Sequence, residues 1–214
     1  GPTHISTYSP CVKKLISASS TLSEKMREEG SSYRRALIGI AQMPSIEKYA
    51  YHLASSFYSE PSGLYYGEKY FGEEAKKDVV EMVNEIIDTY KKRVGNSAIL
   101  SDSTKEKAIL KLSTMRVKMG YPDAVDKLYD KMVFNEKGSL YAMVKELSKV
   151  NRLDSFEKIN QTVDKSVWVM PGHMVNACYN PFTNDITFPA AILQPPFYSI
   201  AQTRSQNLGG IGAV

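Results

Sequence analysis

The spacing of apolar residues predicts that the first two thirds of the chain are helical, because apolar side chains recur there at three- and four-residue steps. The clearest helix spans residues 73–94. Its apolar stripe consists of Val79, Val83, Ile86, Ile87, Tyr90 and Val94. Acidic residues lie near its amino end and basic residues near its carboxyl end, so both complement the helix dipole, and Gly95 can end the helix.

A second helix is predicted to begin at the capping-box pattern Ser103-Thr104-Lys105-Glu106. Its predicted buried face consists of Ala108, Ile109, Leu112 and Met115. We expect this helix to stop at Met119-Gly120-Tyr121-Pro122, because glycine accepts the left-handed cap and proline cannot continue a helix. Weaker helical stripes run through residues 12–26, 46–58 and 140–150.

The pattern changes after Phe156, where β-branched residues, aromatic residues, prolines and asparagines replace the helical spacing. Residues 167–170, 173–179 and 185–188 are predicted strands. The turn-rich residues 180–184 suit a hairpin connection. The sequence therefore predicts an α+β chain, mainly α with a C-terminal β-rich segment, divided into a helical part at 1–155 and a strand-containing part at 156–214.

Composition narrows the class of protein. The 214 residues are 43% hydrophobic and 23% charged, as in an ordinary globular chain. No apolar run approaches the roughly 20 residues of a bilayer-spanning helix, so no membrane-spanning segment is predicted. The net charge is only +4, and the basic residues are mixed with acids along helix faces, so we expect no nucleic-acid partner.

The residues that usually carry chemistry are sparse. Cys11 and Cys178 lie far apart, and none of the histidines at positions 4, 52 and 173 belongs to an HExxH pattern. The sequence therefore predicts no catalytic residue and no metal ligand in this chain. Gly209-Gly210-Ile211-Gly212 lacks the spacing of a phosphate loop and is typical of the start of a buried helix. Because the given chain stops at that point, we expect it to be a truncated piece.

The most informative stretch runs from Val175 to Phe197. Asn176 followed by Ala177 on an edge strand presents an amide beside a small residue, where an extended peptide can add as a further strand. Ile192 and Phe197 can supply an adjacent apolar wall. The residues alone leave the ordinary alternative open, in which the edge strand simply faces solvent.

This stretch resembles the neprilysin family of zinc metallopeptidases, which includes bacterial endopeptidase O and the endothelin-converting enzymes. The family patterns VNAxY, FPAxILQPPF and GGIGxV correspond here to residues 175–179, 188–197 and 209–214. Further similarity, including the Gly120-Tyr121-Pro122-Asp123 segment, extends the resemblance over roughly residues 33–214.

The resemblance implies part of the helical domain that covers the active-site cavity, followed by the first strands of a thermolysin-like catalytic domain. It implies that Asn176 hydrogen-bonds the substrate backbone and that Ala177 offers its carbonyl and amide to the bound strand. Ile192, Phe197 and Val214 would line the pocket for a large apolar side chain just after the scissile bond.

The implied activity is zinc-dependent hydrolysis of oligopeptides. The HExxH helix and the third zinc ligand of the family would lie outside this chain, so zinc is expected in the full-length parent and not in this fragment, which alone should be inactive. The remainder of the catalytic domain and the peptide substrate are the implied partners. The alternative is a non-catalytic helical module that binds peptides through the same edge strand.

Two departures from the family pattern affect the details. Cys178 stands where the family usually has an aromatic residue, which affects the expected subsite preference. No cysteine lies near Tyr49, where animal members tend to carry a disulfide cysteine. The resemblance therefore favours a bacterial, cytoplasmic parent over a secreted or membrane-anchored one.

Overall fold

The computed structural model describes residues 3–214, with side chains from Pro10 onward, and divides into two compact units. One unit, called here the helical unit, combines the chain up to Phe57 with Lys127–Gln161. The other, the sheet unit, combines Tyr58–Asp126 with Thr162–Val214. Both units are discontinuous, unlike the predicted linear division at residue 155, and the assignment to cavity-covering and catalytic domains stays a prediction.

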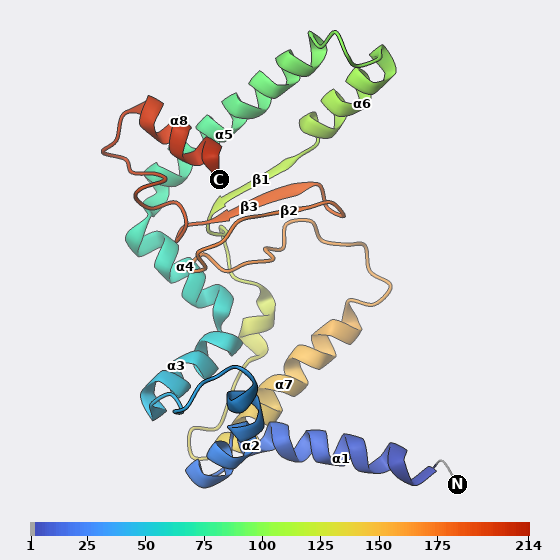
Figure 1. The fold of residues 1–214 in the computed structure, drawn as a ribbon, viewed down its shortest axis with the longest axis vertical. Coiled ribbons are helices and arrows are strands. Elements are labelled where there is room, and N and C mark those ends of the chain that lie inside the picture. The colour runs from blue at the N-terminus through green and yellow to red at the C-terminus, as the bar shows by residue number, and fades with distance from the viewer. Residues whose placement is uncertain (1–2) are drawn as a thin grey trace. The chain divides into compact units, whose positions relative to one another are not determined.

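The helical unit contains no strand among the described residues. Its helices are α1 (Thr3–Ser19), α2 (Glu24–Leu37), α3 (Ile46–Phe57) and α7 (Leu140–Glu157), with the short 3₁₀ helix η1 (Lys127–Lys131) (Figure 1). Side-chain caps begin two of them. Ser23 accepts a hydrogen bond from the Met26 amide, and Ser139 accepts one from the Ala142 amide, so each satisfies an otherwise unpaired donor of the first turn.

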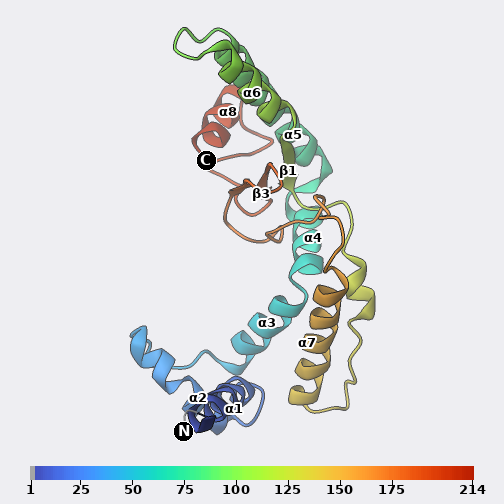
Figure 2. The same cartoon turned by 90° about the vertical axis from the view of Figure 1, so that its right-hand side faces the viewer.

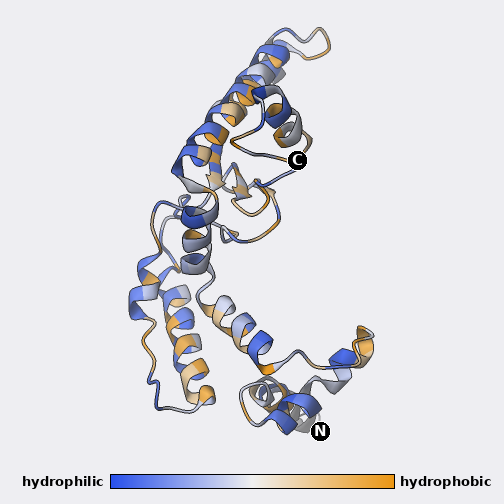
Figure 3. Ribbon diagram, turned by 90° about the vertical axis from the view of Figure 1, so that its left-hand side faces the viewer, coloured by the Kyte–Doolittle hydropathy of each residue, from blue (hydrophilic) through white to orange (hydrophobic). Residues whose placement is uncertain are grey.

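The sheet unit is built on α5, which spans Gly72–Gly95 as the apolar stripe predicts. The other elements are α4 (Ser59–Tyr70), α6 (Asp102–Ser113), α8 (Arg204–Ala213), β1 (Arg116–Gly120), β2 (Cys178–Asn180) and β3 (Asp185–Pro189). Apolar and polar residues alternate along α5 (Figure 3). α6 folds back along α5, and α8 lies beside it (Figures 1 and 2).

The core of the sheet unit forms where the C-terminal segments cover the apolar stripe of α5. Its buried members are Ala75, Val79, Met82, Val83, Ile87, Met119, Leu193, Tyr198 and Ile211. Val79 and Met82 are fully buried. The mainly helical fold with a β-rich segment near its end is therefore confirmed, and the core joins residues more than 100 positions apart.

The prediction for residues 114–119 is wrong, because the chain leaves the helix at Ser113 and forms β1. α6 is capped by Ser101, whose hydroxyl accepts from the Thr104 amide, and not by Ser103. β1 pairs in parallel with β3, so that Val117 lies opposite Ile186 and Met119 opposite Phe188. Periodicity within residues 103–119 cannot reveal a partner nearly 70 residues away.

The hairpin is confirmed, since β2 and β3 pair antiparallel on either side of the turn at residues 181–184. The predicted strands at 167–170 and 173–177 are wrong, because only Cys178–Asn180 enters the ladder. The residues before Cys178 make isolated hydrogen bonds in place of a ladder. Gly172, for example, accepts a hydrogen bond of 3.0 Å from the Ala191 amide.

Two backbones come close where this segment crosses α4. A Cβ atom on Gly63 would lie 2.4 Å from the Gly172 nitrogen, and one on Gly172 would lie 2.5 Å from the Gly63 carbonyl oxygen. Close by, the Gly120 carbonyl accepts a hydrogen bond from the Ala190 amide at 2.7 Å. The crossing therefore depends on the absence of side chains at both glycines.

Among the described residues, no helix has the length and apolar character needed to cross a membrane.

We predict that Gly63→Ala lowers the free energy of unfolding by about 1–3 kcal/mol, because the added methyl group separates the two backbones. Gly209→Ala is the matched control: it also lies in a helix, but nothing stands within 4 Å of its added Cβ. The control should be neutral or stabilising by up to about 1 kcal/mol. Denaturant titration of both variants makes the comparison, and equal behaviour would contradict the close crossing.

Candidate functional site

The strand β2 forms one edge of the sheet, because the strand order is β1-β3-β2. Only β3 pairs with β2 among residues 3–214, so the outer margin of β2 carries no strand there. Asn176 and Ala177 come directly before β2, and Asn176 is exposed to solvent while Ala177 is half-buried. The two residues singled out from the sequence therefore lie beside an open sheet edge.

The side chain of Asn176 is turned toward its own backbone. Its Oδ1 accepts a hydrogen bond of 2.8 Å from the Ala177 amide, and its main-chain amide donates to the Met174 carbonyl at 3.1 Å. No hydrogen-bond partner of Asn176 Nδ2 lies in the described part of the chain. Asn176 thus presents two unused donors to solvent, whereas the amide of Ala177 is already occupied.

The other three predicted site residues follow β3. Ile192 packs, half-buried, against the core. The Phe197 carbonyl oxygen would lie 2.2 Å from a Cβ on Gly210, so α8 approaches closely there. Val214, which is 42% exposed, follows the end of α8 and donates its amide to the Ile211 carbonyl at 3.1 Å. The structure therefore brings Phe197 to α8, which leads to Val214.

The two groups of predicted residues are connected through the backbone. The Ala191 amide donates to the Gly172 carbonyl, which links the residue before Ile192 to the segment that leads into Asn176. No hydrogen bond described for residues 3–214 joins Asn176 or Ala177 directly to Ile192, Phe197 or Val214. The geometry thus places the strand and the apolar residues in one unit without a direct polar contact between them.

Residues that the sequence reasoning missed hold the loop between Phe197 and α8. The Tyr198 hydroxyl donates to Asp78 Oδ2 of α5 at 2.9 Å. Asn207 is buried and pairs twice with the Ser199 backbone, through Oδ1 at 3.1 Å and Nδ2 at 2.9 Å. Arg204 adds an ion pair to Glu85 at 2.6 Å. The local signal was Asp78, one of the acidic residues near the amino end of the predicted 73–94 helix, which the sequence explained by the helix dipole alone.

Burial raises the pKa of the Tyr198 phenol, and its hydrogen bond to Asp78 raises it further. The phenol therefore stays protonated at neutral pH and remains a donor to the carboxylate. This contact keeps the C-terminal loop attached to α5 throughout the neutral range.

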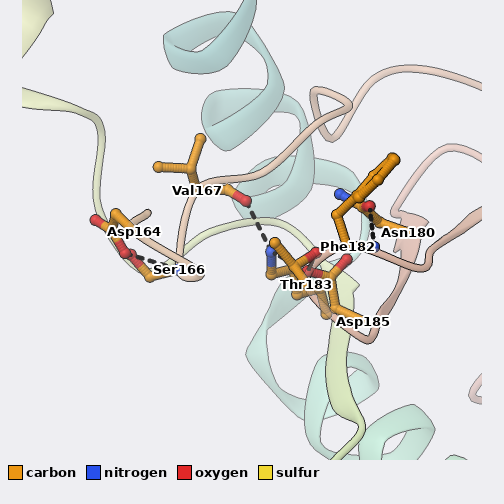
Figure 4. A network of polar contacts seen from close by, with 8 residues as sticks. Asp164, Ser166, Val167, Asn180, Phe182, Thr183 and Asp185 are labelled. Atoms are coloured by element: carbon orange, nitrogen blue, oxygen red, sulfur yellow. Dashed lines mark hydrogen bonds and ion pairs between the residues drawn. The ribbon is translucent and has the colours of Figure 1, made fainter. Parts of the chain in front are cut away.

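A cluster of polar side chains lies on the face of the sheet opposite the apolar core (Figure 4). Asp185 is fully buried, and Lys118 Nζ donates to its Oδ2 at 3.1 Å and to the Val167 carbonyl at 2.7 Å. Thr183 Oγ1 donates to the same carboxylate oxygen. The buried Asp185 carboxylate therefore connects Lys118 of β1 with Thr183 of the β2–β3 turn. Lys118 also binds the irregular segment at Val167.

The cluster is not fully satisfied. Asp185 Oδ1 and Thr187 Oγ1 are buried without a hydrogen-bond partner in the described part of the chain. Cys178 lies directly opposite Thr187 in the β2–β3 register, so both side chains point to this face of the sheet. The residue that departs from the family pattern thus sits at the boundary between this polar cluster and the open edge.

The described residues do not fit a zinc site. Among residues whose side chains are described, no three His, Cys, Asp or Glu side chains come together to hold a metal ion. His52 is exposed on α3, whereas His173 belongs to the sheet unit and is half-buried. His4 lies outside the residues whose side chains are described. No step of a metal-assisted reaction can therefore be assigned to these residues.

A cavity of about 690 Å³ in the sheet unit lies away from the candidate strand. It follows α5 and is lined mainly by charged side chains, including Glu68, Lys76, Glu81 and Asp123. None of the five predicted site residues lines it. We therefore base the site on the open edge of β2 and not on cavity size.

A helix-covered sheet with an open edge strand is a class of structure to which extended peptides can bind. Two family models, both described as Peptidase family M13, match residues 11–122 and 176–214. The chain therefore belongs to peptidase family M13, which confirms the resemblance to the neprilysin family.

Individual relatives agree with this assignment. A neutral endopeptidase of Lactobacillus helveticus is 44% identical over 94% of this chain and 31% of its own length, and mouse neprilysin is 30% identical over 91% and 27%. The crystal structure of PepO from Lactobacillus rhamnosis matches with a TM-score of 0.86 and 43% identity, over 94% of this chain and 32% of that one. The open state of a Mycobacterium tuberculosis zinc metalloprotease matches with a TM-score of 0.83 and 30% identity, over 93% and 31%. The chain thus spans about a third of the length of these relatives.

We predict that Lys118→Met lowers the free energy of unfolding by about 3–5 kcal/mol, because it leaves the Asp185 carboxylate buried without its cation. The double variant Lys118→Met/Asp185→Leu should recover most of the loss, since neither charge then remains. Lys77→Met, which removes an exposed partner of Glu73, is the control and should change stability by less than about 0.5 kcal/mol. A double variant no more stable than Lys118→Met would contradict this account.

Burial lowers the pKa of His173 below its ordinary value of 6.5. The unfolded chain therefore binds a proton more readily than the folded chain, so stability should fall as the pH decreases below about 6.5 and be fully present above it. We predict that His173→Gln flattens this slope between pH 7.5 and 5.5 in thermal unfolding. His52→Gln, at an exposed position, should keep the slope, and a slope unchanged in His173→Gln would exclude His173 as its source.

Proposed function

We propose that this chain forms the part of a zinc metalloendopeptidase that holds an extended peptide substrate. The single observation that carries the proposal is the exposed Asn176-Ala177 pair beside the unpaired margin of β2, within the sequence pattern of the family. An extended peptide can add to such a margin through main-chain hydrogen bonds. Family membership supports the same function.

The side chain of Asn176 is suited to hold a peptide backbone. Its Nδ2 donors are free to bind a peptide carbonyl, whereas the Ala177 amide donates to Asn176 Oδ1. A bound peptide would replace that local bond, because a rotation of the Asn176 side chain frees both the amide and Oδ1. The exchange gives up one internal hydrogen bond and makes one donor and one acceptor available to the peptide backbone, which also orients the peptide.

The apolar residues after β3 would select the side chain that follows the scissile bond. Ile192 and Phe197 are half-buried and Val214 is partly exposed, so each retains some surface for a ligand. A large apolar side chain would bury this surface, at about 25 cal/mol per Å². The proposed substrates are therefore oligopeptides with a hydrophobic residue at that position.

The zinc ligands and the groups that move protons would have to lie outside these 214 residues. The proposed role of this chain is binding and orientation of the peptide, and the chain alone is proposed to be inactive. The cytoplasmic, bacterial placement of the whole peptidase is likewise a proposal that rests on the resemblance.

The test uses the intact polypeptide that carries this chain together with an HExxH segment. Asn176→Ala should lower kcat/KM for an oligopeptide by about 10- to 100-fold, because it removes hydrogen bonds to the substrate worth about 1–3 kcal/mol. The bound zinc, measured by atomic absorption, should stay unchanged. Asn84→Ala, on the exposed face of α5, is the matched control and should leave both quantities unchanged.

Other outcomes separate the alternatives. Equal loss of zinc and activity in Asn176→Ala would mean that the asparagine supports the fold and would sink the proposed role. Tight peptide binding by the intact polypeptide without any cleavage would favour the non-catalytic binding module instead.

A further inference from the structure

Arg27 in α2 of the helical unit is a buried cation whose ion pair among the described residues is long and exposed on the acidic side. The residue is 7% exposed, and its Nε and Nη1 atoms are buried without a hydrogen-bond acceptor among the described residues. Its nearest carboxylate is Glu24, at 3.9 Å from Nη2, whose side chain is 87% exposed. A guanidinium removed from water normally finds an acceptor, so this arrangement is costly as it stands.

The guanidinium is nevertheless held in place. It stacks over the Tyr49 ring of α3, with 4.6 Å between its Cζ atom and the ring centroid. The Tyr49 hydroxyl in turn donates to the Ser20 carbonyl at the end of α1. Three helices of the helical unit therefore orient one cation, which is the kind of preorganisation that a binding site requires.

Arg27 lines a cavity of about 800 Å³ in the same unit. Four cationic residues line it, namely Arg27, Arg34, Arg35 and Lys48, and no acidic residue does. Arg35 is engaged by Ser31 Oγ and the Ala41 carbonyl, whereas the side chains of Arg34 and Lys48 have no polar partner in the part of the chain that is described. The cavity thus has an excess of positive charge.

The other lining residues are apolar or carry uncharged polar groups. Its apolar side chains include Ile16, Tyr33, Ile38, Ile40 and Met43, of which Tyr33 is 76% exposed and Ile38 58% exposed. Ser19, Ser31 and Gln42 add hydroxyl and amide groups. A ligand that fits must therefore combine a negative charge with apolar groups and with hydrogen-bonding groups between them.

We propose that this cavity binds an acidic polypeptide segment: one Asp or Glu carboxylate pairs with Arg27, and neighbouring apolar side chains occupy the rest. A planar guanidinium matches a carboxylate in a two-pronged hydrogen bond. The cations come from both α2 and α3 and are interleaved with apolar residues. This lining suits a peptide that combines acidic and apolar side chains better than an aliphatic chain with one charged end. The proposal is independent of the peptidase function, since every residue involved lies in the helical unit.

The experiment compares two labelled peptides by fluorescence anisotropy against the 214-residue chain. The probe is acetyl-Leu-Leu-Glu-Leu-Leu-amide, and its partner carries Gln in place of Glu, so the two differ only in the charge. We expect the Glu peptide to bind at least about tenfold more tightly, which is about 1.4 kcal/mol. The difference should shrink as salt is raised, because the pair is partly screened.

Variants assign the effect to Arg27. Arg27→Met keeps an unbranched apolar stem but removes the guanidinium, and it should reduce the preference for Glu to less than about twofold. Arg93→Met is the matched control, an exposed arginine of the sheet unit, and should keep the full preference. The melting temperature of Arg27→Met should stay the same or rise, because the unpaired charge is removed.

Each contrary result overturns the proposal. Equal binding of the two peptides to the unmodified chain would exclude carboxylate recognition, and this test does not depend on whether any variant folds. Retention of the Glu preference in Arg27→Met would exclude Arg27. Sodium acetate and sodium decanoate are compared as competitors at one concentration. Displacement of the peptide by acetate would show a small-anion site, and stronger displacement by decanoate would show a lipid site.

Discussion

The parallel pairing of β1 with β3 is the contact on which the rest of the sheet unit depends. It joins Arg116–Gly120 to Asp185–Pro189, so it closes a loop of nearly 70 residues and brings the segment after β3 onto α5. With one side of β3 occupied by β1, β2 pairs on the other side of β3 and becomes an edge strand. Leu193, Tyr198 and Ile211 then bury the apolar stripe of α5. The proposed peptide-binding margin is thus a consequence of a strand pair that itself contacts no peptide.

The two faces of this sheet are stabilised by different interactions. One face packs Val117, Met119 and Phe188 against the core, where burial of apolar surface is the main contribution. The other face carries the Lys118–Asp185 pair, which specifies register more than it adds stability, because desolvation offsets most of the attraction. A one-residue slip of β3 would turn Asp185 into the apolar core and leave Lys118 unpaired.

The helical unit shows the opposite balance. Few of its described side chains are fully buried, and many large apolar residues of α1, α2, α3 and α7 are exposed. Arg27 is buried, and its Nε and Nη1 atoms have no acceptor among the described residues. The helical unit therefore exposes apolar side chains and contains a buried cation with unused donors. In the sheet unit, by contrast, the buried Lys118 ammonium has two acceptors, Asp185 and the Val167 carbonyl.

The sequence alone determined the features that depend on neighbours within a few positions: the length of α5, the hairpin at residues 180–184, and the pattern that places the chain in its family. It also singled out Asn176 and Ala177, because their motif is contiguous. Only the tertiary structure decided that residues 116–120 are a strand, that Asp78 binds Tyr198 and that Arg27 keeps Nε and Nη1 without an acceptor among the described residues. These depend on partners 20 to 120 positions away or on a missing one, and local periodicity contains no information about which distant group will approach. The open margin beside Asn176 is therefore visible only once the strand order is known.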